Sequence, residues 1–233
     1  MSTHIADSRA VVAEAIGTAL LLVAVVGSGI MGDRLSGGNA GIALLANSLA
    51  TGAALAVLIL TFGPVSGAHF NPAVSIADAA QGGLSWTRAA SYIAAQTGGA
   101  FVGVAVADAM FGEPLYAAST HARAGWPLAL GEAVATFGLL AVIWSCSRRR
   151  ADAVPFAVGA YITGAYWFTS STSFANPAVT LARAATNTFT GIRPADVPLF
   201  LVAQTVGAAA ATLLCRWLVP PSPIEEESPH AVL

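Results

Sequence analysis

Ser173-Phe174-Ala175-Asn176-Pro177-Ala178-Val179 has a near-duplicate earlier in the chain, Gly67-Ala68-His69-Phe70-Asn71-Pro72-Ala73-Val74. The two Asn-Pro pairs lie 105 residues apart in a chain of 233 residues. In each pair, Asn suits the N-cap of a helix and Pro suits its first position, where a missing N–H costs nothing. Long apolar runs flank both copies, so the sequence predicts two short helices, about Asn71–Ala80 and Asn176–Thr186, that begin at membrane depth.

The composition places the chain in a lipid bilayer. Hydrophobic residues make up 56% and charged residues 9%, and the mean hydropathy is +0.70, whereas soluble domains carry about 25% charged residues. A net charge of −2 gives no basic surface for nucleic acid. Six segments have the roughly 20 apolar residues that a membrane-spanning helix needs. They are about Arg9–Met31, Asn39–Phe62, Trp86–Met110, Trp126–Cys146, Val154–Thr172 and Ala195–Val219.

The duplication extends beyond the Asn-Pro pairs. The sequence AEAIGT, which contains Glu14, resembles GEAVAT, which contains Glu132. The sequence AQTGGA, which contains Gln96, resembles AQTVGA, which contains Gln204, and the order is the same in both halves. Each half therefore contains three spans and one re-entrant segment, in repeats of about residues 9–110 and 126–219. Three spans per half place the halves in opposite orientations, which predicts an all-α membrane protein with an inverted repeat.

We expect residues 1–220 to form one transmembrane channel domain. Arg148, Arg149 and Arg150 lie between the fourth and fifth spans, and the positive-inside rule then places both termini in the cytoplasm. The polar tail 221–233, with three consecutive glutamates, is expected to be a disordered cytoplasmic segment.

Two re-entrant helices that meet inside a membrane favour a pore for uncharged polar molecules. Their positive N-terminal ends would repel cations and hydronium, while Asn71 and Asn176 would offer amide donors. The extended runs 64–70 and 169–175 would line the path with carbonyls. Glu14 and Glu132 are interpreted as acceptors that brace these runs, with a proton relay as the alternative.

Other classes of protein lack support in the sequence. We find no phosphate-binding loop, no HExxH or GxSxG motif and no paired acids, so neither an enzyme, a cofactor nor a metal site is expected. An inverted-repeat secondary transporter remains a second hypothesis, since such repeats also build transporters.

The two Asn-Pro-Ala motifs, Asn71-Pro72-Ala73 and Asn176-Pro177-Ala178, together with the Glu14 and Glu132 repeats, resemble the aquaporin (major intrinsic protein) family. The resemblance covers nearly the whole chain. It implies the aquaporin fold, six transmembrane helices plus two half-helices, a homotetramer with one pore per protomer, and a location in the cell (inner) membrane. It also implies passage of water or small neutral solutes.

Four positions match the family's selectivity filter: Thr51, Gly164, Ser173 and Val179. Most members have Arg directly after the second Asn-Pro-Ala, where this chain has Val179. Four small residues predict a wide constriction, similar to that of bacterial aquaglyceroporin-like channels associated with arsenic resistance. This favours arsenous acid, other metalloid hydroxides or organoarsenicals, with glycerol, urea and water also open. A water-selective aquaporin is the alternative.

Two further residues are candidates for the path. Arg183 lies one helical turn beyond Val179, where it either reaches back to the mouth of the pore or points to water or a neighbouring loop. His69 lies two residues before Asn71, where it either lines or gates the path or is a packed, hydrogen-bonded histidine.

Overall fold

The computed structural model describes residues 2–220, and the predicted disordered tail 221–233 lies outside the described residues. The described chain is helical and contains no strand. Short 3-10 turns precede two of the helices, at Ala151–Ala153 (η1) and Pro194–Asp196 (η2). The α-helices are α1 (Ser2–Leu35), α2 (Ala40–Ser66), α3 (Pro72–Gln81), α4 (Trp86–Phe111), α5 (Trp126–Arg149), α6 (Val154–Phe168), α7 (Pro177–Arg183) and α8 (Val197–Leu218).

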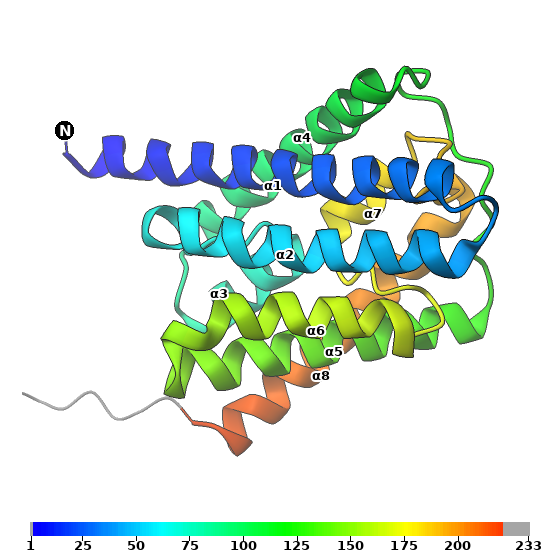
Figure 1. Ribbon diagram of the computed structural model, residues 1–233. Coiled ribbons are helices and arrows are strands. Elements are labelled where there is room, and N and C mark those ends of the chain that lie inside the picture. Colours follow the sequence, from blue (N-terminus) through cyan, green and yellow to red (C-terminus); the bar gives the residue numbers. More distant parts are fainter. Residues whose placement is uncertain (1, 221–233) are drawn as a thin grey trace, which may run out of the picture.

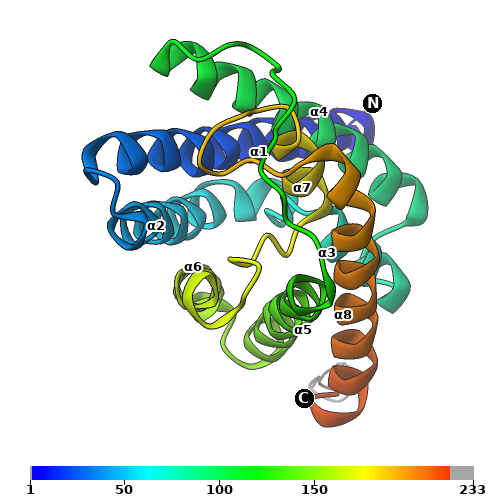
Figure 2. The ribbon, with the colours of Figure 1, turned by 90° about the vertical axis from the view of Figure 1, so that its right-hand side faces the viewer.

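The helices pack as two matching halves. α1 packs on α2 and α4, α5 packs on α6 and α8, and α2 meets α6 where the halves join. The short α3 and α7 lie within the bundle formed by the long helices (Figures 1 and 2). We call the end of the bundle at which α1 begins the proximal end, and the opposite end the distal end.

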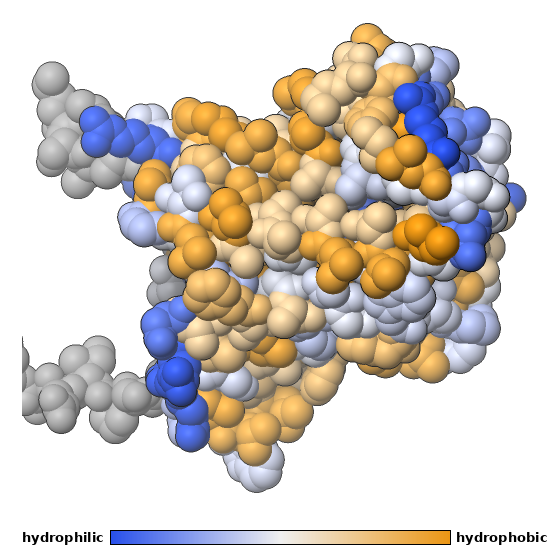
Figure 3. All heavy atoms as spheres, in the orientation of Figure 1, coloured by the Kyte–Doolittle hydropathy of each residue, from blue (hydrophilic) through white to orange (hydrophobic). Residues whose placement is uncertain are grey.

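The surface fits a bilayer. Figure 3 shows hydrophobic residues across the middle of the face in view and hydrophilic residues toward both ends. In the described part of the chain, five helices are long and apolar enough to cross a membrane: α1, α2, α4, α5 and α8, the last counted with η2. α6 has only 15 residues, about 22 Å, and the preceding three-residue η1 adds about 6 Å, close to the roughly 30 Å of a hydrocarbon core.

The half-helices begin where the Asn-Pro pairs predict. Asn71 has φ −153° and ψ 117°, and its side chain accepts a hydrogen bond from the N–H of Ala73. Asn176 has φ −155° and ψ 114° and accepts from Ala178 and Val179. The two caps therefore have nearly the same conformation, as an inverted repeat requires, and each leads into a helix too short to cross a membrane: α3 has 10 residues and α7 has 7.

Several predicted boundaries were wrong. The first extended run begins at Gly67 and not at Pro64, because α2 accommodates Pro64 and ends at Ser66; Gly67 then caps the helix with φ 86°. The fifth span ends at Phe168 and not at residue 172. α7 ends at Arg183, three residues before the predicted end of the second half-helix.

Candidate solute pathway

The N-termini of α3 and α7 are tied to each other. The Nδ2 group of Asn71 donates to the carbonyl of Ala175 at 2.8 Å, and Nδ2 of Asn176 donates to the carbonyl of Phe70 at 2.8 Å. Each Asn therefore caps its own helix through its side-chain oxygen and holds the opposite segment through its amide nitrogen. The second N–H of each amide remains for a passing molecule, because an amide has two donors.

The segments that lead into the half-helices have unusual backbone conformations. Ala68 and Phe70 have φ of 50° and 49°, and the matching Ser173 and Ala175 have φ of 51° and 47°. Non-glycine residues rarely adopt positive φ, and such residues persist where surrounding contacts enforce them, often at functional sites. These contacts come from two buried glutamates.

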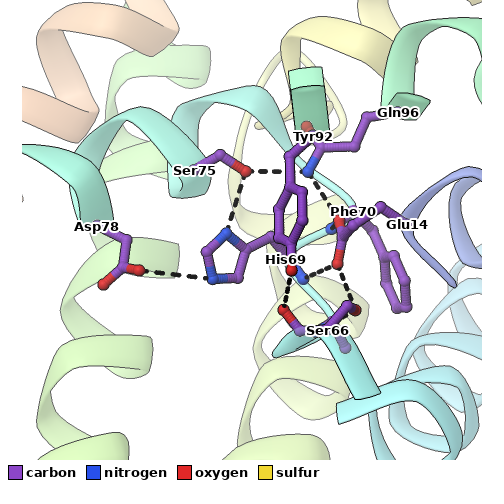
Figure 4. A network of polar contacts seen from close by, with 9 residues as sticks. Glu14, Ser66, His69, Phe70, Ser75, Asp78, Tyr92 and Gln96 are labelled. Carbon is purple, nitrogen blue, oxygen red and sulfur yellow. Dashed lines mark hydrogen bonds and ion pairs between the residues drawn. The ribbon is translucent and has the colours of Figure 1, made fainter. Parts of the chain in front are cut away.

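Glu14 on α1 accepts four hydrogen bonds (Figure 4). Its Oε1 accepts from the hydroxyl of Ser66 at 2.6 Å and from the N–H of His69 at 2.9 Å. Its Oε2 accepts from the N–H of Phe70 at 2.7 Å and from Nε2 of Gln96 at 2.8 Å. The side chain is fully buried, and donors occupy both of its oxygens.

Glu132 on α5 makes the matching set in the second half. Its Oε1 accepts from the hydroxyl of Ser171 at 2.6 Å and from the N–H of Phe174 at 2.8 Å. Its Oε2 accepts from the N–H of Ala175 at 2.9 Å and from Nε2 of Gln204 at 2.6 Å. The duplication in the sequence is thus reproduced contact by contact.

A cavity of about 300 Å³ runs along these segments. Of the four predicted filter positions, Thr51, Ser173 and Val179 line it, as do Asn71 and Asn176. Gly164 is half-buried and is not among the lining residues. Tyr166, two residues further along α6, lines the cavity instead, and its hydroxyl lies 3.2 Å from Oγ1 of Thr51. The remaining wall is largely apolar and includes Leu21, Val25, Leu55, Ile59, Leu139, Ile143, Val158 and Ile162.

His69 lines the cavity and is also held by polar partners. Its Nδ1 lies 3.0 Å from the hydroxyl of Ser75, and its Nε2 lies 3.8 Å from a carboxylate oxygen of Asp78 (Figure 4). Its ring also meets the ring of Tyr92 edge to face, with 5.6 Å between centroids. His69 therefore both lines the cavity and is packed and hydrogen-bonded, so the structure is compatible with both interpretations of this residue.

Arg183 is buried, with 2% of its surface exposed, and it also lines the cavity. Its Nε donates to the carbonyl of Thr190 in the loop after α7. Its guanidinium carbon lies 3.3 Å from the centroid of the Phe174 ring. The side chain thus both contacts a neighbouring loop and faces the path, and it does not point into open water.

Some residues of the site were missed by sequence reasoning. Gln96 and Gln204 each join a glutamate to a hydroxyl on a half-helix, Ser75 at 2.9 Å and Thr180 at 2.8 Å. The repeated AQT sequences were the available signal, but their role was not inferred. Tyr166 had no such signal, because its position in the path depends on the rotation of α6.

Comparison with known proteins places the chain in a family. The model of the major intrinsic protein family matches residues 1–168, and the chain belongs to this family. It is therefore a membrane channel and not an enzyme, and the hypothesis of a secondary transporter is set aside.

Particular relatives support this assignment. The chain is 54% identical to aquaglyceroporin AqpS of Rhizobium meliloti (strain 1021) over 215 residues, covering 92% of each protein. It is 31% identical to aquaporin-2 of Rattus norvegicus, covering 98% of this chain and 85% of the relative. The X-ray structure of the aquaglyceroporin from Plasmodium falciparum matches with a TM-score of 0.75 at 23% identity, covering 91% of this chain and 97% of the other. The fold is thus the aquaporin fold, and the chain is a passive channel for small neutral solutes.

Proposed function

We propose that this channel passes neutral solutes wider than water, with arsenous acid and related metalloid hydroxides or organoarsenicals as favoured substrates. Glycerol, urea and water are further candidates. The 54% identical relative AqpS is named an aquaglyceroporin, which supports glycerol as one of them. The observation that carries the proposal is Val179, which lines the cavity together with Thr51 and Ser173. Val179 leaves room that an arginine at this position would occupy, although Tyr166, and not Gly164, lines the cavity beside Thr51.

Charge exclusion is assigned to the centre of the path. The N-termini of α3 and α7 meet there, and each contributes about half a positive charge. Pro72 and Pro177 start these helices without an N–H, and Ala73 and Ala178 keep the first turn small. A neutral molecule can accept from Asn71 and Asn176, whereas a cation meets repulsion.

Glu14 and Glu132 are assigned the bracing role. Each carboxylate accepts four hydrogen bonds, two of them from backbone N–H groups of the extended segment. A proton on the carboxylate would weaken these bonds, which argues against a proton relay through either residue.

We further propose that the channel is a homotetramer in the cell (inner) membrane, with residues 1–220 as its single domain. Arg148 and Arg149 lie in the last turn of α5, at the proximal end, and Arg150 is its C-cap, so the positive-inside rule assigns the proximal end to the cytoplasm. Glu113→Cys places a thiol at the distal end, and a membrane-impermeant thiol reagent added outside intact cells is expected to label it; labelling only after the cells are opened would contradict this orientation. Native mass spectrometry in detergent tests the tetramer.

Stopped-flow swelling of proteoliposomes with water, glycerol, urea and arsenous acid tests the substrate. Wild type is expected to pass all four, and Val179→Arg to slow the larger solutes more than water. Val179→Leu is the matched control, because it adds volume without a guanidinium. Passage of water alone by the wild type would show that the constriction is not wide. Unchanged passage of glycerol and arsenous acid through Val179→Arg would show that this position does not control size.

A further inference from the structure

Arg183 brings an unpaired cation into the cavity. It is the largest fully buried side chain among the described residues. Within that part of the chain its only hydrogen bond is from Nε to Thr190, and no carboxylate pairs with it. Its terminal NH₂ groups remain free. A buried charge without a partner is costly, so this arrangement suits a site that a ligand completes.

A second arginine lies beside the first. Arg123 belongs to the loop between α4 and α5, and its guanidinium carbon is 5.1 Å from the centroid of the same Phe174 ring that Arg183 contacts. Its Nε donates to the carbonyl of Gly191 at 2.8 Å, and its Nη1 lies 3.5 Å from Oγ1 of Thr172. These contacts hold Arg123 at the distal end of the bundle, between the segments that follow α6 and α7. Of the two arginines, Arg183 lines the cavity itself.

Among the described residues, no carboxylate forms an ion pair with the guanidinium of Arg123. Asp196 accepts from the backbone N–H of Arg123 at 2.8 Å, and its other oxygen accepts from Arg193 at 2.8 Å. Its carboxylate therefore fixes the loop without binding the guanidinium. Burial lowers the pKa of Arg123 below its ordinary value, but arginine side chains stay charged in proteins.

The charges along the cavity are segregated. Asp78 is the one acidic residue among the described lining residues, and it lies beside His69, on the half-helix that runs to the proximal end. The distal part carries Arg183, and the centre carries the positive ends of α3 and α7. Like charges in a narrow, low-dielectric cleft focus the field and raise the local concentration of opposite charge.

We propose that Arg123 and Arg183 form a binding site for small oxyanions at the distal mouth of the channel, arranged around Phe174. A guanidinium matches the paired acceptor oxygens of a carboxylate- or sulfonate-type group. The apolar wall beyond the site cannot solvate a full charge, so an oxyanion docks at the mouth without crossing. A docked oxyanion therefore obstructs neutral solutes. This inference rests on the proposed function, because it places the site on the same pathway.

Inhibition of glycerol flux tests the site. Proteoliposomes are loaded with methanesulfonate, which remains ionised, at equal concentrations on both sides of the membrane. Dimethyl sulfone, a neutral molecule of similar shape, is the control. Methanesulfonate is expected to slow glycerol entry through the wild type, and dimethyl sulfone is not. Equal effects of the two probes on a wild type that conducts glycerol would overturn the oxyanion site, whereas a wild type without solute flux would overturn the proposed function instead.

Substitutions assign the effect to the two arginines. Arg183→Gln and Arg123→Gln are each expected to raise the half-inhibitory concentration of methanesulfonate at least about tenfold, as loss of a charged hydrogen bond implies. Arg34→Gln is the matched control, since Arg34 is also at the distal end but is exposed and pairs with Glu113 at 2.7 Å. If Arg183→Gln does not fold, Arg123→Gln, which lies on a loop, still tests whether the arginines bind methanesulfonate. An unchanged half-inhibitory concentration in Arg123→Gln would overturn its part in the site.

Discussion

Glu132→Gln is expected to destabilise the second half of the channel by about 3–6 kcal/mol. The carboxylate accepts four hydrogen bonds in a fully buried setting, from Ser171, Phe174, Ala175 and Gln204. An amide oxygen can keep two of these bonds, but the NH₂ group that replaces the other oxygen faces two donors. Each lost bond to a charged group costs about 1.5–3 kcal/mol. The total is a large share of the roughly 5–15 kcal/mol by which a protein is stable.

The midpoint of thermal unfolding in detergent and the yield of folded protein measure this effect. Both are expected to fall for Glu132→Gln and, because the contacts match, by a similar amount for Glu14→Gln. Thr205→Val is the control, since its hydroxyl bonds only the carbonyl of Leu201 on an exposed face of α8. An unfolding midpoint equal to that of the wild type would refute the bracing role and reopen the proton relay for these residues.

Two smaller perturbations test the packing and the centre of the path. Gly99→Ala is expected to destabilise the protein by about 1–3 kcal/mol, because the added Cβ would lie 2.2 Å from the carbonyl oxygen of Ala15. Gly98→Ala is the matched control on α4, because nothing lies within 4 Å of its added carbon, and it is expected to leave stability unchanged or to raise it. Equal unfolding midpoints for the two variants would contradict the close approach of α1 and α4. Asn176→Ala removes the cap of α7 and the hydrogen bond to the carbonyl of Phe70. We expect it to lower the free energy of unfolding by about 1–2 kcal/mol and to reduce solute flux at equal protein content. A flux equal to that of the wild type would contradict the role assigned to this amide.

The architecture was readable from the sequence because its signals are local and repeated. Asn and Pro set the start of each half-helix through their own backbone chemistry, and the duplicated glutamates identified the inverted repeat. Helix ends were less predictable. α2 includes Pro64, and the left-handed conformation of Gly67, rather than the proline, ends it.

Some of the residues that line the path were predictable from the sequence and others were not. Thr51, Ser173 and Val179 line the cavity as counted from the motifs, since the first lies in a regular helix and the others lie within a few residues of Asn176. Gly164 does not line it, and Tyr166 does, because the face that α6 turns to the cavity depends on its packing against α2 and α5.

The sequence by itself determined the membrane location, the duplication, the two capped half-helices and the valine after the second Asn-Pro-Ala. Each of these features follows from composition or from short motifs of neighbouring residues. Only the tertiary structure showed that two arginines lie close to one aromatic ring at the distal end of the bundle. Arg183 and Arg123 are 60 positions apart in the chain, yet both guanidinium groups lie against the ring of Phe174. Hydrogen bonds from Arg123 to the residues after α6 and α7 bring them together, and these long-range contacts leave no periodic signal in the sequence.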